Sequence, residues 1–345
     1  GPKRPISSAA CWIFPGAPVY HGGFTDTPKR RTLALMLQLI APLLMLSAAA
    51  TGEIPYETIT FNSTHDQTAQ PARFYPSPAK GPQPLLVQLH TWSSDIESFN
   101  PDDWVTAARA RNWHVVVPHF RGANKKSEAC ASPAARQDIL DSVEAAKARA
   151  EVDPARIYLC GVSGGGHMAL VMAAHSPETW TAVSAWVGIS DLTAWHGETK
   201  AAGRDYWEDV EACVGGAPGS GAAADEQLRI RSPLYFLSGA TSLPLDINTG
   251  IHDGHTGSVP IHHSLDAFNI LAETLGLPGV SQSRINALSQ EWVPAAPPVL
   301  DPNYERGIYL REAAGKARIT VFDGGHEGLT DSACLWLALH TKKKD

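Results

Sequence analysis

Five residues near the middle of this 345-residue chain carry its clearest chemical signal. Residues 161–165 read Gly-Val-Ser-Gly-Gly, directly after an apolar run at 157–160 and directly before a helix-forming segment. This context is typical of a nucleophile elbow, a sharp turn that lifts a serine hydroxyl above the edge of a sheet. The alternative interpretation is an ordinary glycine-rich turn. We predict that Ser163 is a nucleophile, which would attack a carbonyl carbon.

A serine hydroxyl is a weak nucleophile near neutral pH and needs a base that accepts its proton. His326 lies between glycines in Gly-Gly-His-Glu-Gly, directly after the apolar run 319–322. A histidine on a loop after the last predicted strand can reach a serine on another strand end, and we predict that His326 is the base. Three other histidines could line the pocket: His167, His196 and His255. The simpler expectation is that these three lie at the surface or have structural roles.

The base in turn needs an acid that orients it. Asp253 follows the predicted strand 245–249, so it would lie on the loop where such a carboxylate is needed. Asp246 is a rival, but it lies inside that strand and could be a buried structural charge. Asp323 is too close to His326 in the sequence to be a comfortable partner. We predict Asp253 as the acid.

Acyl transfer also needs N–H donors for the negatively charged oxygen of the tetrahedral intermediate. The backbone N–H of Gly164, directly after the serine, is the first candidate. The second should come from the loop after the predicted strand 85–89, which begins His-Thr-Trp-Ser. We predict the N–H of Trp92, with Thr91 as the next candidate. Trp92 could instead be only a wall of the pocket.

The elements that would position these residues alternate between strand and helix, which predicts βαβ units and a mostly parallel sheet. Two stretches, 191–242 and 278–311, interrupt the rhythm and could form a lid over the site; surface decoration is the alternative. The predicted strands span 56–61, 72–75, 85–89, 114–117, 156–159, 182–186, 245–249 and 318–322, and the predicted helices 103–111, 133–150, 165–175 and 332–341.

Several motifs in a fixed order resemble the catalytic domain of prolyl oligopeptidase-type serine hydrolases, within the α/β-hydrolase superfamily. The resemblance covers about residues 83–341. It implies an α/β-hydrolase fold, with a mostly parallel central sheet flanked by helices and lid-like insertions, and a triad of Ser163, Asp253 and His326. The motifs are the His90 loop, Pro-His-Phe-Arg-Gly at 118–122, 152–157 leading into 161–167, Gly250-x-x-Asp253, Val-Pro at 259–260 and Gly-Gly-His-Glu at 324–327.

The chain also departs from that pattern. Thr91 stands where a glycine is usual, and residues 254–257 lengthen the loop after Asp253. These departures favour a single-domain, esterase-like member that cleaves carboxylic esters of small molecules or acylated carbohydrates. A serine peptidase and a non-catalytic binding protein are the alternatives. Aromatic faces suit sugar rings, and four tryptophans fall near or within the lid segments: Trp186, Trp195, Trp207 and Trp292.

The first fifty residues have the composition of a secretory signal peptide. Basic residues 29–31 precede an apolar run at 33–46, and small residues follow at 47–50. A membrane anchor and a buried helix are the alternatives, but the run is short for a span of about 20 residues. We therefore predict a leader over 1–51, a catalytic domain over 52–345, a secreted or periplasmic enzyme, and no stable membrane insertion after cleavage.

Charge and cysteine usage limit the other function classes. The net charge is −7, and the body of the chain holds no basic block, which argues against a nucleic-acid partner. No Cys-x-x-Cys or His-x-x-x-His spacing indicates a metal site, and the proposed chemistry needs no cofactor. Cys130 and Cys213, in polar and loop-like surroundings, could form a disulfide, while Cys160 and Cys334 are expected to be buried thiols.

Overall fold

A computed structural model describes residues 54–290 and 299–343 of the chain. The predicted leader, 1–51, and Trp292 lie outside the described residues. No helix within the described part is both long and apolar enough to cross a bilayer.

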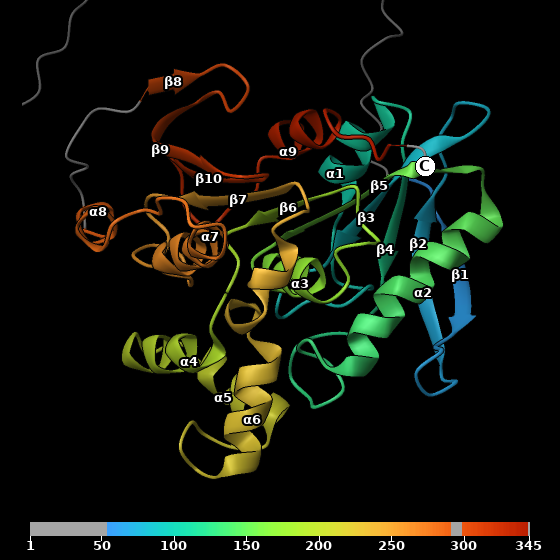
Figure 1. Ribbon diagram of the computed structural model, residues 1–345. Helices are drawn as coiled ribbons and strands as arrows, with labels where there is room; N and C mark the ends of the chain where they lie inside the picture. The colour runs from blue at the N-terminus through green and yellow to red at the C-terminus, as the bar shows by residue number, and fades with distance from the viewer. Residues whose placement is uncertain (1–53, 291–298, 344–345) are drawn as a thin grey trace, which may run out of the picture. The chain divides into compact units, whose positions relative to one another are not determined.

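One mixed sheet organises the described residues (Figure 1). Its strands lie in the order β1-β2-β4-β3-β5-β6-β7-β10-β9-β8. Neighbours from β4 to β10 pair in parallel, while both edges are antiparallel. The strands are β1 (Glu57–Asn62), β2 (Ala69–Tyr75), β3 (Gln83–Leu89), β4 (His114–Pro118), β5 (Val152–Val162), β6 (Ala182–Trp186), β7 (Leu245–Gly250), β8 (Val299–Asp301), β9 (Arg306–Ala314) and β10 (Ala317–Phe322).

Helices cover both faces of this sheet, as the predicted βαβ alternation requires. Helices α1 (Asp102–Arg109) and α9 (Thr330–Leu337) pack together on one face. The other face carries α2 (Pro133–Arg149), α3 (Gly164–His175) and α7 (His262–Thr274) (Figure 1). Each face has its own buried apolar cluster, because the central strands are apolar on both sides.

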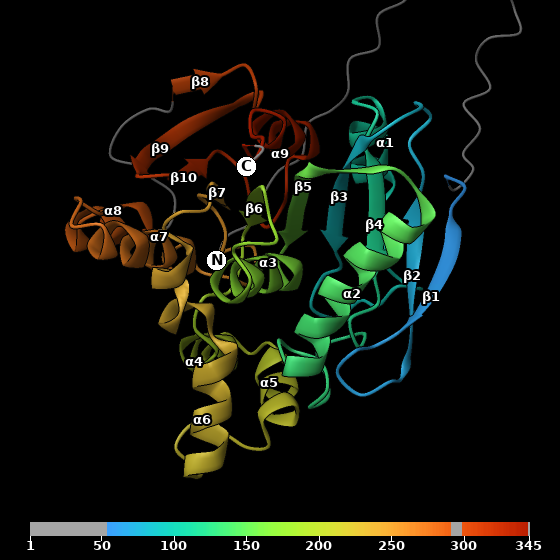
Figure 2. The same ribbon diagram turned by 45° about the vertical axis from the view of Figure 1, so that its right-hand side comes forward.

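A group of three short helices lies beyond the carboxyl ends of the central strands (Figure 2). We call α4 (Leu192–Ala201), α5 (Tyr206–Val214) and α6 (Ala222–Arg231) the cap. They contact one another and share a third apolar cluster with residues that follow β3, β6 and β7. The stretch 191–242, which interrupts the predicted alternation of strand and helix, therefore contains three helices that were not predicted from the sequence. Helices this short lack the long apolar period that identifies a helix.

Several other elements differ from the sequence-based expectation. The stretch 278–311 contains α8 (Gln282–Leu288) together with β8 and β9, which extend the sheet by an antiparallel edge. Helix α7 was not predicted, and β5 begins at Val152 rather than at residue 156. The opening pair of strands and the parallel core are as predicted.

Candidate active site

The nucleophile elbow lies at the carboxyl end of β5, the central strand of the parallel core. Ser163 has φ 59° and ψ −120°, a strained backbone conformation, and its side chain stands between the end of β5 and the start of α3. Its N–H donates to the carbonyl of Trp186 on the neighbouring β6, 2.9 Å away. A Cβ atom on Gly161 would lie 2.2 Å from the carbonyl oxygen of Gly165, so this turn requires glycine.

Asp253 and His326 meet because the strands that carry them are neighbours. Strands β7 and β10 pair in parallel with Gly250 opposite Phe322, so the loops after both strands begin at the same level. Backbone bonds continue this pairing past the strands, including one from the N–H of His252 to the carbonyl of Gly324, at 3.0 Å. His326 Nδ1 lies 2.8 Å from Asp253 Oδ2.

The loop after β7 is shaped around the Asp253 carboxylate. Oδ1 accepts from the N–H groups of Gly254 and Val259, at 2.9 and 3.2 Å, while the carboxylate is closed off from solvent. A Cβ on Gly257 would lie 2.0 Å from Oδ1 and 2.6 Å from the Cβ of His326. The four residues that lengthen this loop therefore wrap the carboxylate and orient it, a role that the sequence did not reveal.

The rival acid, Asp246, has other partners. It is fully buried, with Oδ1 accepting from Arg318 Nε at 2.8 Å and Oδ2 accepting from the amide of Asn248 at 2.9 Å. Asp246 is thus a structural charge that pairs β7 with β10. The structure places Asp253, and not Asp246, against His326.

The loop that carries His326 returns toward the end of β5. A Cβ on Gly328 would lie 2.6 Å from Cγ2 of Val162, the residue before Ser163. His326 Nε2 lies 3.5 Å from the hydroxyl of Ser258, and no hydrogen bond within the described residues joins it to Ser163. In this structure, Ser258 therefore contacts the nitrogen that would face the serine, and the His326–Ser163 bond would have to form when substrate binds.

A pair of backbone N–H groups lies beside the serine. Gly164 is the first residue of α3, so its N–H has no partner inside the helix. A Cβ on Gly164 would lie 2.4 Å from both the N and the Cα of Trp92, which places the two backbones in direct contact. Thr91, the alternative donor, uses its side chain to bond the Ser94 hydroxyl at 2.8 Å. The arrangement can hold an oxyanion between Trp92 and Gly164.

Two residues that the sequence did not single out hold Trp92 in place. Its indole Nε1 donates to Asp209 on α5 at 3.2 Å, and its carbonyl accepts from the N–H of Asn124 at 2.9 Å. Trp195 on α4 packs edge-on against it with ring centroids 4.6 Å apart. The cap thus contacts the loop after β3 directly. Sequence offered no signal for this contact, because Trp92 and Asp209 are far apart in the chain.

The remaining histidines named from the sequence have structural partners. His167 is fully buried and contacts the carbonyl of Ile189 at 3.0 Å, and burial lowers its pKa to about 4. His196 pairs with Glu211 at 2.9 Å within the cap, and His255 contacts the carbonyl of Ser289 at 3.0 Å.

The tryptophans expected to stack on sugar rings are mostly inaccessible. Trp186 and Trp195 are buried, Trp186 donating to Ser184 and Trp195 to the carbonyl of Ser258. Trp207 is half-buried and covered on one face by the ammonium group of Lys200, 4.1 Å from the ring centroid.

The four cysteines in the described residues are all buried free thiols. This matches the expectation for Cys160 and Cys334. The polar surroundings expected for Cys130 and Cys213 are wrong, because both side chains pack in the apolar cluster beneath the cap.

Comparison with known proteins now decides the family. Residues 101–276, about half of the chain, match the prolyl oligopeptidase family. The chain belongs to the prolyl oligopeptidase family. It is therefore a serine hydrolase, as its resemblance to that family implied.

Two curated proteins show sequence similarity to this family member. The chain is 23% identical to poly(3-hydroxyalkanoate) depolymerase C of Paucimonas lemoignei over 169 residues, 46% of this chain and 41% of that protein. It is 27% identical to dipeptidyl peptidase family member 6 of Caenorhabditis elegans over 227 residues, 62% of this chain and 27% of that protein. The chain spans less than half the length of either relative.

Solved structures of peptidases share the fold. Uncomplexed Pyrococcus horikoshii acylaminoacyl peptidase aligns with a TM-score of 0.55 at 15% identity, over 82% of this chain and 40% of that chain. A Mycobacterium tuberculosis puromycin-hydrolyzing peptidase aligns with a TM-score of 0.51 at 19% identity, over 64% and 34% of the two chains. These likenesses confirm the predicted α/β-hydrolase fold for this prolyl oligopeptidase-family chain.

One group of side chains among the described residues of this family member has the composition of a cation site. Glu198 on α4 contacts Nε2 of His262 and of His263 on α7, at 2.6 and 3.0 Å. Nδ1 of His263 accepts from the backbone N–H groups of Ser190 and Asp191, so its proton lies on Nε2 and is donated to Glu198. These contacts make the group a hydrogen-bonded link between the cap and α7.

His262 in this link carries a positive charge. Burial lowers its pKa, but the carboxylates of Asp266 and Glu198, at 2.9 and 2.6 Å, outweigh burial and raise the pKa to about 9. Burial raises the pKa of Glu198, while bonds to His262 and His263 lower it to about 2. The link is therefore an ion pair at neutral pH.

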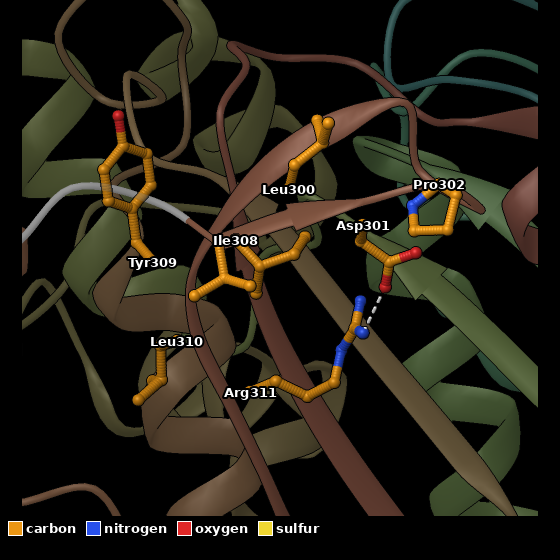
Figure 3. A pocket seen from close by; sticks show the side chains of 8 residues that line it. Leu300, Asp301, Pro302, Ile308, Tyr309, Leu310 and Arg311 are labelled. Carbon is orange, nitrogen blue, oxygen red and sulfur yellow. Dashed lines mark hydrogen bonds and ion pairs between the residues drawn. The ribbon is translucent and has the colours of Figure 1, made fainter.

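A groove of about 490 Å³ lies between β8 and β9, away from Ser163 (Figure 3). Leu300 and Ile308 contribute apolar side chains to it, and Asp301 pairs with Arg311 at its end. None of the residues that line it belongs to the Ser163 site, so we do not assign the groove to the reaction.

Proposed function

We propose that this protein is a secreted serine esterase that cleaves carboxylic esters through a covalent acyl-enzyme. The observation that carries the proposal is the convergence of three features at one sheet edge. These are the strained Ser163, the Asp253–His326 pair at 2.8 Å, and the adjoining backbones of Trp92 and Gly164.

In the proposed reaction, Ser163 Oγ attacks the ester carbonyl while His326 Nε2 accepts its proton. The N–H groups of Trp92 and Gly164 stabilise the oxyanion. Asp253 holds Nδ1 and stabilises the imidazolium that forms. The intermediate collapses as His326 returns the proton to the leaving alcohol. Water, activated by the same base, then attacks the acyl-enzyme and releases the acid and the free serine. These steps use no metal or cofactor.

One comparison favours an ester over a peptide as the substrate. The similarity to a protein named as a polyhydroxyalkanoate depolymerase, a polyester-cleaving enzyme by its name, extends over 46% of this chain. We therefore propose small-molecule esters, acylated carbohydrates and aliphatic polyesters as substrate classes. The proposed leader over 1–51 would direct the enzyme to secretion, with no membrane-inserted or nucleic-acid-bound form.

A serine peptidase is the second candidate, and one feature of the cap favours it. The first turn of α5 carries Glu208 and Asp209, and Asp209 bonds the indole of Trp92. A carboxylate near the oxyanion loop could hold the ammonium group at the amino terminus of a peptide. The similarity to a dipeptidyl peptidase family member is consistent with this candidate.

A matched substrate panel separates these candidates. The purified full chain and its Ser163→Ala variant are assayed with p-nitrophenyl acetate and butyrate, aminoacyl p-nitroanilides, acetylated xylan and a poly(3-hydroxybutyrate) suspension. Labelling with a fluorophosphonate reports the nucleophile independently of substrate. We expect fast ester cleavage, inert anilides and labelling at residue 163, all lost in the variant.

Three other results would contradict the esterase proposal. Anilide turnover at rates comparable to ester turnover would establish the peptidase. Absence of both turnover and fluorophosphonate labelling in folded protein would exclude an active serine and favour a binding role. Ester cleavage that persists in Ser163→Ala would place the nucleophile at another residue.

A further inference from the structure

Two buried cysteines meet where the cap joins the rest of the molecule. Cys130 lies in the segment between β4 and α2, and Cys213 lies in the last turn of α5. Both are almost fully buried, in the apolar cluster that also contains Trp92. The interaction with the Cys213 thiol, together with burial, raises the pKa of the Cys130 thiol. The two side chains therefore lie in one apolar cluster at the junction of the cap and the sheet.

Cys130 is connected to the oxyanion loop by two hydrogen bonds. Its N–H donates to the side-chain oxygen of Asn124 at 2.7 Å, and the N–H of Asn124 donates to the carbonyl of Trp92 at 2.9 Å. Trp92 in turn lies against Gly164. A displacement of Cys130 would therefore reach the two proposed oxyanion donors through a short series of contacts.

Cys213 is connected to the same tryptophan from the cap side. Asp209, which accepts from the Trp92 indole at 3.2 Å, is four residues before Cys213 and lies on the same face of α5. A covalent bond between Cys130 and Cys213 would close a ring of contacts around Trp92, holding its indole from one side and its carbonyl from the other.

Arg231 adds support beneath Cys130. Its guanidinium donates to the carbonyls of Ala129 and Cys130, at 2.9 and 3.1 Å, and to that of Ser127 at 2.9 Å. Arg231 ends α6, so a second cap helix fixes the backbone of this segment. The sulfur of Cys130 is thus held in a defined position, as a disulfide requires.

We propose that Cys130 and Cys213, which are free thiols in this structure, are oxidised to a disulfide that ties the cap to the oxyanion loop and positions Trp92. The two thiols each lose a proton and an electron as the S–S bond forms. A second disulfide, either oxidised glutathione or the disulfide of a protein oxidation catalyst, accepts the two electrons and the two protons and becomes two thiols. Because both sulfurs are buried in the folded protein, the exchange takes place during folding, before α5 packs. The positioning role, unlike the bond itself, rests on the proposed function.

Peptide mapping tests the bond without any assay of activity. The full chain is refolded with a reduced and oxidised glutathione mixture, denatured, blocked with N-ethylmaleimide and digested with trypsin without reduction. We expect the peptides 127–136 and 205–229 to be recovered joined, with Cys160 and Cys334 blocked as free thiols. Recovery of both peptides separately, each carrying the blocking group, would overturn the disulfide.

Comparison of redox forms tests the positioning role. Enzyme refolded in the presence of excess reductant should have a kcat for a p-nitrophenyl ester roughly 10-fold below that of the oxidised form. KM should change less than about threefold, because a shifted donor weakens the stabilisation of the transition state more than it weakens substrate binding. The melting temperature should fall by roughly 5–10 °C. The Cys130→Ala/Cys213→Ala variant should have the kcat and melting temperature of the reduced enzyme, whether or not reductant is present. The Cys334→Ala variant should show the same difference between redox forms as the wild type.

The outcomes separate the two proposals. A joined peptide pair with kcat unchanged by reduction would overturn the positioning role and leave a purely structural bond. A joined pair in a protein that has no ester turnover in either redox form would overturn the proposed function and leave the disulfide established. A response to reductant that survives in Cys130→Ala/Cys213→Ala would assign the effect to other cysteines.

Discussion

Gly164 and Trp92 touch through their backbones, with no room for a side chain between them. A Cβ at residue 164 would lie 2.4 Å from both the N and the Cα of Trp92. The start of α3 and the loop after β3 are thus in direct contact beside Ser163, and this contact requires glycine at position 164.

Gly164→Ala should therefore impair turnover by displacing the Trp92 loop. We expect kcat for a p-nitrophenyl ester to fall by about 10²–10³, the typical effect of losing one oxyanion donor. Gly197→Ala is the matched control, because nothing lies within 4 Å of its Cβ position in α4. That control should retain activity and gain up to about 1 kcal/mol of stability. Wild-type kcat in Gly164→Ala would exclude Trp92 as the second donor.

Substitution of the two buried aspartates on β7 and the loop after it should affect different properties: Asp253→Asn should lower turnover, and Asp246→Asn should lower stability. Asp253→Asn keeps the size of the side chain but removes the charge that orients His326, and kcat should fall by about 10⁴ with little change in the melting temperature. Asp246→Asn instead leaves Arg318 without its partner. It should cost about 2–4 kcal/mol of unfolding free energy while the folded fraction keeps near-normal turnover.

Measurement of kcat alongside urea unfolding for both variants checks this pair. The reverse pattern, with turnover lost in Asp246→Asn and kept in Asp253→Asn, would make Asp246 the acid.

The sequence predicted the parts of the site whose signals are local. Strand, tight turn and helix around Ser163 follow one another within a few residues, so their pattern identifies the elbow. His326 was identified by its glycine neighbours and its place after an apolar strand. Sequence alone does not separate Asp253 from Asp246, because the difference depends on the pairing of β7 with β10. That pairing places Asp253 beside His326 and Asp246 beside Arg318.

Contacts between distant segments could not be predicted. The bond from Trp92 to Asp209 spans 117 residues and depends on how the cap packs. The cap helices themselves have 9 or 10 residues each, too few for a clear apolar period. Cys130 looked polar from its neighbours, yet the cap buries it.

Trp92→Phe should distinguish a backbone donor from an indole donor. The phenyl ring keeps the backbone N–H but loses the bond to Asp209, so turnover should slow less than about 10-fold and stability should fall by about 1 kcal/mol. Asp209→Ala should have a similar effect, and the two changes together should be non-additive because they remove one interaction. If Trp92→Phe instead slows turnover about 100-fold or more, as loss of an oxyanion donor does, the indole itself contributes to the reaction.

The link between the cap and α7 should make stability depend on pH through His262. Its pKa in the folded protein is about 9, above its ordinary value of about 6.5, because Asp266 and Glu198 outweigh the effect of burial. A raised pKa means that the stabilisation is fully present below about pH 6.5 and is lost as the pH rises through about 9. Glu198, with its pKa lowered to about 2, keeps its contribution until strongly acidic pH.

His262→Ala should accordingly reduce the unfolding free energy by about 1–2 kcal/mol at pH 6, with the deficit shrinking toward pH 9.5. Besides the two carboxylates, His263 is the titratable group that stacks on His262, with ring centroids 4.5 Å apart. Urea unfolding at half-unit pH steps measures the difference, and His65→Ala, at an exposed position on the turn between β1 and β2, is the control. The control should show a small deficit independent of pH. A His262→Ala deficit that is equally flat, or that grows with rising pH, would mean that His262 is not held as a cation by Glu198 and Asp266.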